Sequence, residues 1–403
     1  MKAVKLSEIC TFSRGLTYSK SDEVDFSNNV VLRANNIDLD SNSLNLEDLR
    51  YIKDSIQIKK DKIAKKNSLI ICTASGSKTH VGKVALIDED YGYAFGGFMG
   101  QLTPTDKCHP KFLYYILTSG LFKDFLMSLN DGTNINNLKF SDIENYEVPL
   151  PSVEMQVNIV KKLDSAFAEI DLLEINLGVG EEKANQLIQS ILSSAFSSDK
   201  DENGSNNPSD NQLTVRKLVS LGTVAEIIAG QSPEGIYYNS NGDGAPFYQG
   251  KKEFGDKFLG APTTWTTKVT KLAQSGDILM SVRAPVGPIN FSTQEICIGR
   301  GLASIRASKS VDKEFLYYFL LHKQPDISGN TGAVFDSINK EQIASIGIPV
   351  PSLEKQREIV EMLDSAFTEV ELLKAQISTK KDYASALRQS LLSNAFTHEE
   401  AVA

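Results

Sequence analysis

Two long stretches of the chain carry apolar residues at helical spacing. In the first, Pro149 and Pro151 block an early start, and Ser152 is a good N-cap residue. The residues that follow form a heptad seam with spacings of 4, 3, 7, 3, 4 and 3, at Val153, Val157, Val160, Phe167, Ile170, Glu174 and Leu177. Ala184, Leu187, Ile191 and Leu192 continue the stripe. The pattern predicts a helix from Ser152 to Phe196, about 67 Å long.

The second stretch repeats the first at a constant offset of 200 residues. Val148–Glu174 reads VPLPSVEMQVNIVKKLDSAFAEIDLLE, and Ile348–Lys374 reads IPVPSLEKQREIVEMLDSAFTEVELLK, with no gap between the copies. A second helix is therefore expected from Ser352 to Phe396. Because solenoid and propeller units are only about 20–50 residues long, each copy of this repeat must contain a whole domain followed by a helix.

The first block before a helix alternates short β-type runs with polar turns that contain Gly and Asn. We expect strands at Asn29–Ala34, Ser68–Ala74 and Lys83–Asp88. We also expect one helix at Lys111–Leu129, whose apolar residues recur at helical spacing and are typical of a core-facing surface.

The second block has the same plan. Strands are expected at Gly276–Pro285 and Gly301–Ala307, and a helix at Lys313–Leu321. Leu218–Pro233 echoes Leu6–Ser19, and Gly329–Ile343 corresponds to Leu129–Ile143. The repeat therefore extends over the domains as well as the helices.

The order of these segments predicts an α+β fold. Two strand-rich α/β domains would be joined by a pair of long antiparallel coiled-coil helices, because helices of equal length bury their stripes best on each other, with a pseudo-two-fold internal repeat. We expect a first domain over residues 1–147, a central helix over 148–198, a polar linker over 199–214, a second domain over 215–347 and a distal helix over 348–398.

Charge is unevenly distributed along the chain. The net charge is −9, with −1 on residues 1–147, −7 on 148–211, +2 on 212–347 and −3 on 348–403. The acidic excess therefore belongs to the helical repeats, and the domains are near neutral with locally basic loops. This distribution is compatible with a nucleic-acid partner without requiring one.

Motifs that would indicate catalysis fail on inspection. Gly76–Val84 places its Gly-Lys pair one residue late for a phosphate loop, and Ala94–Gly100 lacks the spacing of a dinucleotide-binding turn. The cysteines (Cys10, Cys72, Cys108 and Cys297) and histidines (His80, His109, His322 and His398) are too scattered for a metal site. There is no apolar run of 18 residues and no signal-peptide pattern. We expect a cytoplasmic protein without catalytic or metal-binding residues.

The paired motif P-x-P-S-x-E-x-Q-x-x-I-V at Pro149 and Pro349 resembles that of the specificity (S) subunits of type I restriction-modification systems. Ser281–Gly287 and Cys297–Arg306 also resemble a subgroup of their target recognition domains. The resemblance implies a non-catalytic subunit that reads an asymmetric bipartite DNA site, one domain per half-site. It further implies two methylation (M) subunits that use S-adenosylmethionine to modify adenine, and restriction (R) subunits that cleave with ATP and magnesium, so all cofactors would lie in the partners.

Arg can bind guanine, and Asn or Gln adenine, through paired hydrogen bonds in the major groove. We therefore expect loop residues to contact bases: Arg33, Asn35, Asn36, Lys78, His80, Asn134 and Asn136 in the first domain, and Gln249, Lys251, Arg283, Arg300, Asn330 and Thr331 in the second. Subunit docking is expected at the helices, on Glu154, Gln156, Asp164, Phe167, Glu354, Gln356, Asp364 and Phe367.

Two other functions are compatible with the residues. One is a coiled-coil scaffold with two ligand-binding heads and no DNA partner. The other is the specificity part of a split or fused adenine methyltransferase whose catalytic part lies elsewhere. A salt-sensitive complex with DNA would exclude the scaffold.

Overall fold

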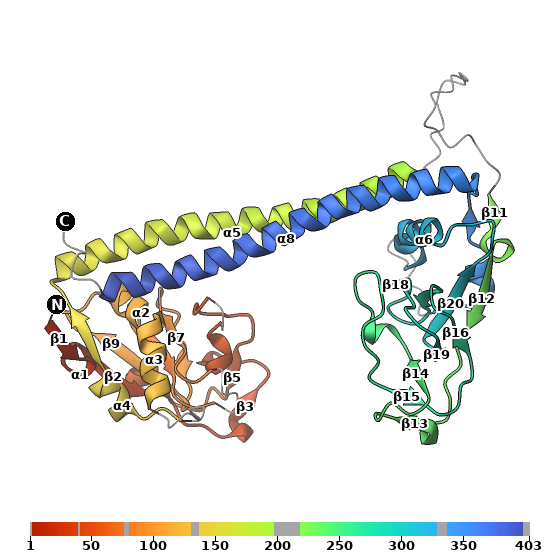
Figure 1. Ribbon diagram of the computed structural model, residues 1–403. Helices are drawn as coiled ribbons and strands as arrows, with labels where there is room; N and C mark the ends of the chain where they lie inside the picture. The colour runs from red at the N-terminus through yellow and green to blue at the C-terminus, as the bar shows by residue number, and fades with distance from the viewer. Residues whose placement is uncertain are drawn as a thin grey trace. The chain divides into compact units, whose positions relative to one another are not determined.

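The computed structural model describes residues 2–38, 41–75, 80–129, 137–196, 218–328 and 337–397. The chain forms two compact units, one made of Met1–Leu177 with Thr379–Ala403 and the other of Gly178–Ser378. Each unit contains one strand-rich domain and one segment of each long helix (Figure 1). The expected linker, 199–214, lies outside the described residues.

In the first unit, the described strands form two four-stranded sheets and a two-stranded ribbon. The first sheet has the antiparallel order β2 (Cys10–Arg14), β9 (Met99–Pro104), β6 (Leu69–Cys72) and β7 (Val84–Leu86). The second has the order β3 (Glu23–Val24), β5 (Arg50–Ile52), β4 (Asn29–Leu32) and β8 (Ala94–Phe95), with β4 and β8 parallel. The ribbon pairs β1 (Lys2–Lys5) with β10 (Glu147–Leu150), next to the short helix α1 (Leu6–Ile9).

The described part of the second unit repeats this topology. Its first sheet runs β12 (Ala225–Ala229), β20 (Leu302–Ala307), β17 (Ile278–Ser281) and β18 (Ile289–Phe291). Its second runs β13 (Tyr238–Asn239), β15 (Trp265–Thr266), β14 (Ala245–Tyr248), β19 (Ile296–Ile298) and the extra strand β16 (Leu272–Ala273). The ribbon pairs β11 (Val219–Ser220) with β21 (Gly347–Ile348). The repeat predicted from the sequence is therefore a repeat of strand order.

The helix expected at Lys111–Leu129 is divided in two. The structure has α2 (Pro110–Thr118) and α3 (Gly120–Ser128), separated by Ser119 in an extended conformation. The Ser119 hydroxyl donates to the carbonyl of Ile116 at 2.7 Å, a side-chain bond that competes with helix continuation. In the second unit α6 (Lys313–Ile327) is unbroken and longer than expected. Short helices α4 (Phe140–Asn145) and α7 (Lys340–Ala344) precede β10 and β21.

The two long helices are α5 (Val153–Phe196) and α8 (Leu353–Thr397). The predicted N-cap is confirmed: the Ser152 hydroxyl accepts from the Met155 N–H at 3.3 Å. In the first unit the beginning of α5 packs on the end of α8, and in the second unit the end of α5 packs on the beginning of α8. This is the pairing of antiparallel helices, and the predicted fold class is confirmed.

The buried seam of α5 differs from the predicted one in detail. Val153 and Leu187 are each 45% exposed, whereas Ile159 and Leu163 are buried. At Ile159 and Leu163 the helix faces its own domain as well as α8. The buried stripe is therefore wider than the seam of a two-helix coiled coil. In the first unit Phe167 also lies under the Arg388 guanidinium of α8, 4.8 Å from its carbon, and Arg388 pairs with Asp171.

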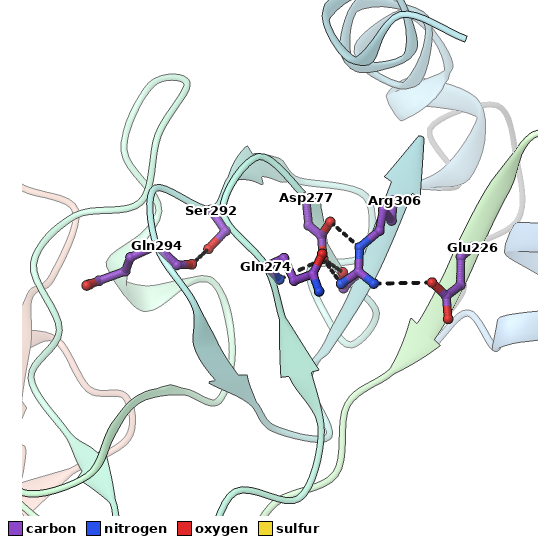
Figure 2. A network of polar contacts seen from close by, with 7 residues as sticks. Glu226, Gln274, Asp277, Ser292, Gln294 and Arg306 are labelled. Atoms are coloured by element: carbon purple, nitrogen blue, oxygen red, sulfur yellow. Dashed lines mark hydrogen bonds and ion pairs between the residues drawn. The ribbon is translucent and has the colours of Figure 1, made fainter. Parts of the chain in front are cut away.

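A buried ion pair fixes the first sheet of the second unit. Arg306 of β20 donates to both carboxylate oxygens of Asp277 at 2.8 Å, and to Glu226 of β12 at 3.2 Å (Figure 2). The Ser304 hydroxyl and the Gln274 N–H also donate to Asp277. The Asp277 carboxylate raises the pKa of Arg306. Arg306 is therefore a structural residue and is not free to bind a ligand.

Candidate nucleic-acid interface

The second domain has a hollow of about 220 Å³ at the ends of three segments. The segments are the end of β14, the end of β17 and the loop from β19 to β20. The lining residues are Gln249, Gly250, Lys251, Ser281, Arg283, Ala284, Arg300 and Gly301. Four expected base-contacting residues, Gln249, Lys251, Arg283 and Arg300, thus lie around one hollow.

Backbone hydrogen bonds hold the three segments together. The Gly299 N–H donates to the Tyr248 carbonyl at 2.8 Å, and the Gly301 N–H donates to the Gln249 carbonyl at 3.1 Å. The Val282 N–H donates to the Gly301 carbonyl at 2.9 Å. A Cβ at Gly301 would lie 2.3 Å from the Gln249 carbonyl oxygen, so this close approach requires glycine. The floor of the hollow is therefore rigid.

The side chains at the rim are exposed donors. Arg283 and Arg300 both reach solvent, and neither forms an ion pair with any residue in the described ranges. Their backbones are held in place, Arg300 by donating its N–H to the Ser232 hydroxyl at 3.2 Å and Arg283 by a bridge to Ser337. Two guanidinium groups that have no ion-pair partner among the described residues and stand on a fixed backbone can donate paired hydrogen bonds to guanine or to phosphate. This is the chemistry of a nucleic-acid contact.

Each long helix is attached to its own domain by a buried glutamine. Gln156 and Gln356 are both 0% exposed. Gln156 Oε1 accepts from the backbone N–H of His109 at 2.7 Å, and its Nε2 donates to the carbonyls of Lys107 and Pro151. Gln356 makes the equivalent bonds to Asp312, Ser310 and Pro351 in the second unit.

A tyrosine and an aspartate form a second attachment about two turns further along each helix. The Tyr115 hydroxyl of α2 donates to Asp164, which Lys111 also contacts at 2.8 Å. Tyr318 of α6 donates to Asp364 in the same way. Burial and then the aspartate hydrogen bond raise the pKa of both tyrosines, which keeps them protonated donors.

These contacts revise the expected docking residues. Gln156, Gln356, Asp164 and Asp364 bind the helix to its own domain, and Phe167 and Phe367 pack edge-on against Tyr115 and Tyr318. Of the expected set, Glu154, Glu354 and Asp364 are exposed, and Asp364 is already held by Tyr318. The recurrence of Gln and Asp in both helices could be detected in the sequence. In the structure these residues attach each helix to its own domain.

Models of known families match residues 1–177 and 216–380 of this chain to the type I restriction modification DNA specificity domain. The match includes both strand-rich domains and the beginnings of both long helices. The chain belongs to the type I restriction-modification specificity family. The resemblance drawn from Pro149 and Pro349 is thereby confirmed.

Individual relatives and solved structures agree with this assignment. The chain is 34% identical over 327 residues to the protein assigned as the MjaX specificity subunit of Methanocaldococcus jannaschii, covering 78% of this chain and 75% of that one. It is 24% identical over 423 residues to the EcoKI specificity subunit of Escherichia coli K12, covering 98% and 88%.

Two solved structures match at 27% sequence identity. One is the HsdS subunit from Thermoanaerobacter tengcongensis, with a TM-score of 0.58 over 98% of this chain and 96% of that one. The other comes from a type I restriction-modification system described for its complex assembly and conformational transition, with a TM-score of 0.77 over 98% and 97%. The family fold therefore extends over nearly the whole chain.

The expected contacts in the first domain of this specificity-family chain have three different environments. Asn36 is fully buried, where its amide donates to the carbonyls of Asn45 and Asp48 and its oxygen accepts from the Arg33 N–H. It therefore shapes the turn and cannot reach a base. Arg33 is partly exposed and pairs with Asp48 at 3.0 Å, whereas Asn35 is exposed.

The remaining expected residues are only partly accounted for. His80 lies in the described turn before β7. Five lie outside the described residues: Lys78, Asn134, Asn136, Asn330 and Thr331.

Among the described residues, no group of His, Cys, Asp and Glu could hold a metal ion. All four cysteines are buried as free thiols, and burial raises the pKa of Cys72 to about 11 and of Cys108 to about 12. None of the helices in the described ranges is long and apolar enough to cross a bilayer.

Proposed function

We propose that this chain is the DNA-recognition subunit of a type I restriction-modification complex, and that each strand-rich domain reads one half of an asymmetric bipartite site. The observation that carries the proposal is the hollow with the exposed guanidinium groups of Arg283 and Arg300 at its rim, in a chain of the specificity family. The base-contacting set that we retain from the described residues is Arg33, Asn35, His80, Gln249, Lys251, Arg283 and Arg300.

The helix pair would set the distance between the two half-sites. Residues 1–147 and 215–347 would then be the target recognition domains, 148–198 and 348–398 the spacer helices, and 199–214 the linker between repeats. The buried glutamines and the Tyr–Asp pairs support this role, because a spacer transmits its length only if each end is attached firmly to its domain.

Two M subunits would dock on the helices, at surfaces other than the buried residues. Large apolar side chains are exposed on α5 in the first unit, where Leu172 is 60% and Leu173 is 42% exposed. The equivalent residues of α8 in the second unit, Leu372 and Leu373, are 60% and 43% exposed. Two chemically equivalent apolar surfaces fit two copies of one partner.

Catalysis would belong to the partners. The M subunits would use S-adenosylmethionine to methylate adenine, and R subunits would add magnesium- and ATP-dependent cleavage. The complex would act in the cytoplasm, where its DNA substrate is accessible.

The test is a mobility-shift series with the chain and purified M subunits on random-sequence DNA. The proposal expects a complex whose affinity falls steeply as salt rises, because phosphate contacts release counterions. A Leu172→Glu variant should bind one M subunit fewer by mass photometry. If the assembly shows no affinity for DNA at low salt, the chain is a protein scaffold.

A further inference from the structure

The first domain has a loop equivalent to the one that lines the hollow of the second domain, and two of the same backbone hydrogen bonds hold it. The Thr73 N–H donates to the Phe98 carbonyl at 2.9 Å, as the Val282 N–H does to Gly301. The Gly96 N–H donates to the Leu32 carbonyl at 2.9 Å, as the Gly299 N–H does to Tyr248. The loop Gly96–Gly97–Phe98–Met99 is therefore equivalent to Gly299–Arg300–Gly301–Leu302.

The bridges on the neighbouring strand agree with this correspondence. Ala74 bridges Asn137 in the first domain, and Arg283 bridges Ser337, 200 residues later than Asn137, in the second. Ala74 thus occupies the place of Arg283, and Gly97 that of Arg300. The first domain lacks both of the arginines that define the second domain's hollow.

The described cation at the end of β4 is neutralised. Arg33 follows β4 as Gln249 follows β14, and its guanidinium is held by Asp48 at 3.0 Å. Among the described residues, the positions of Arg283 and Arg300 in the second domain are therefore occupied in the first by the small residues Ala74 and Gly97, next to Phe98.

Phe98 is the large side chain at this place. It is 71% exposed, although a phenyl ring gains stability from burial. Its carbonyl accepts three hydrogen bonds, from the Thr73 N–H at 2.9 Å, the Ala74 N–H at 3.2 Å and the Thr73 hydroxyl at 2.9 Å. A rigid backbone thus holds an apolar ring in solvent, and the loop is the glycine-rich segment Ala94–Gly100 that matches no cofactor motif.

We propose that Phe98 is a specificity-determining contact of the first domain, and that it binds the apolar edge of a base pair, the C5-methyl group of thymine. This rests on the proposed DNA-reading function and adds to it a chemical difference between the two domains. Arginine donors select the acceptors of guanine, whereas an aromatic ring selects the methyl group that distinguishes thymine in the major groove. Equivalent loops would then read different bases in the two half-sites.

The test removes one methyl group at a time. After the modified motif is identified, each thymine of the half-site assigned to the first domain is replaced by deoxyuridine, and binding of the complete complex with M subunits is measured. We expect one replacement to weaken wild-type binding about fourfold, the equivalent of one buried carbon. Phe98→Ala should bind the thymine and deoxyuridine duplexes equally and leave the other half-site unaffected.

Phe26→Ala is the matched control, because Phe26 is 78% exposed in the same domain. It should keep the wild-type response to deoxyuridine. The inference is overturned if Phe98→Ala keeps that response, if no thymine responds in the wild type, or if Phe98→Ala fails only in M-subunit assembly. Failure of the proposed function itself would look different, since the wild-type complex would then discriminate no sequence at all.

Discussion

Gln156 Oε1 accepts a hydrogen bond at 2.7 Å from the backbone N–H of His109, the residue just before α2. Gln356 makes the same bond to Asp312 before α6. A fully buried amide thereby attaches the helix to its domain in each unit, and the two glutamines are 200 residues apart.

Replacing Gln156 with Ala should lower the stability of the first domain by about 1–3 kcal/mol, because the His109 N–H and the Lys107 carbonyl lose a buried partner. Hydrogen exchange should accelerate at residues 107–113. Gln186→Ala on the same helix is the control, since Gln186 is exposed and bonds only to Glu182 in the described structure. Equal exchange in the two variants would show that the glutamine does not hold the helix.

Replacing Asp277 with Ala should destabilise the second unit by about 3 kcal/mol, because Arg306 would be left partly buried beside a single exposed partner, Glu226. Trp265 is the one tryptophan of the sequence and lies in β15 of this unit, so its fluorescence in urea reports this loss. Asp243→Ala, at an exposed turn of the same unit, should leave the midpoint unchanged.

The second unit should also lose stability in acid through His322. Burial, and then the charge of Lys323, lower the pKa of His322, which stacks on Phe196. As the pH falls, the unfolded chain therefore takes up a proton on His322 before the folded chain does. The stability that neutral His322 contributes is complete above its unfolded pKa of about 6.5 and is lost as the pH falls below that value. Trp265 unfolding curves from pH 8 to 5 should show the wild type losing more stability than His322→Gln. Parallel losses would exclude His322 as the cause.

Insertions into the long helices test whether these helices set the distance between the two half-sites. Inserting four residues after Leu177 and four after Ile377 adds about 6 Å to each helix, close to the rise of two base pairs. The modified motif should keep both half-sites and gain a longer gap. An insertion of the same length in the 199–214 linker should leave the gap unchanged. If the helix insertions preserve activity and the original gap, the helices do not set the spacing.

Much of the fold could be predicted because its signals are local. Ser152 marks the start of α5, and the β-type runs around Leu69 and Ile278 became central strands. The break at Ser119 was missed because neighbouring residues continue a helical pattern, and only the side-chain bond to Ile116 reveals it.

The site could be predicted only in part. Arg300 and Arg306 look alike in the sequence, yet Arg306 is held by a carboxylate from a distant strand and Arg300 reaches solvent. Gln156 was expected on a docking surface because repetition shows that a residue matters without showing which way it faces. Phe98 was missed because exposure is decided by tertiary packing.

We propose that each domain reads its own half of the DNA site. The most direct measurement is modification-site sequencing of DNA methylated by complexes that contain the wild type, Arg283→Ala, Arg300→Ala or the exposed control Lys309→Ala. We expect a bipartite wild-type motif, relaxation of one half only in both arginine variants, and an unchanged motif for Lys309→Ala. Equal relaxation of both halves, or an uninterrupted wild-type motif, would contradict the proposal.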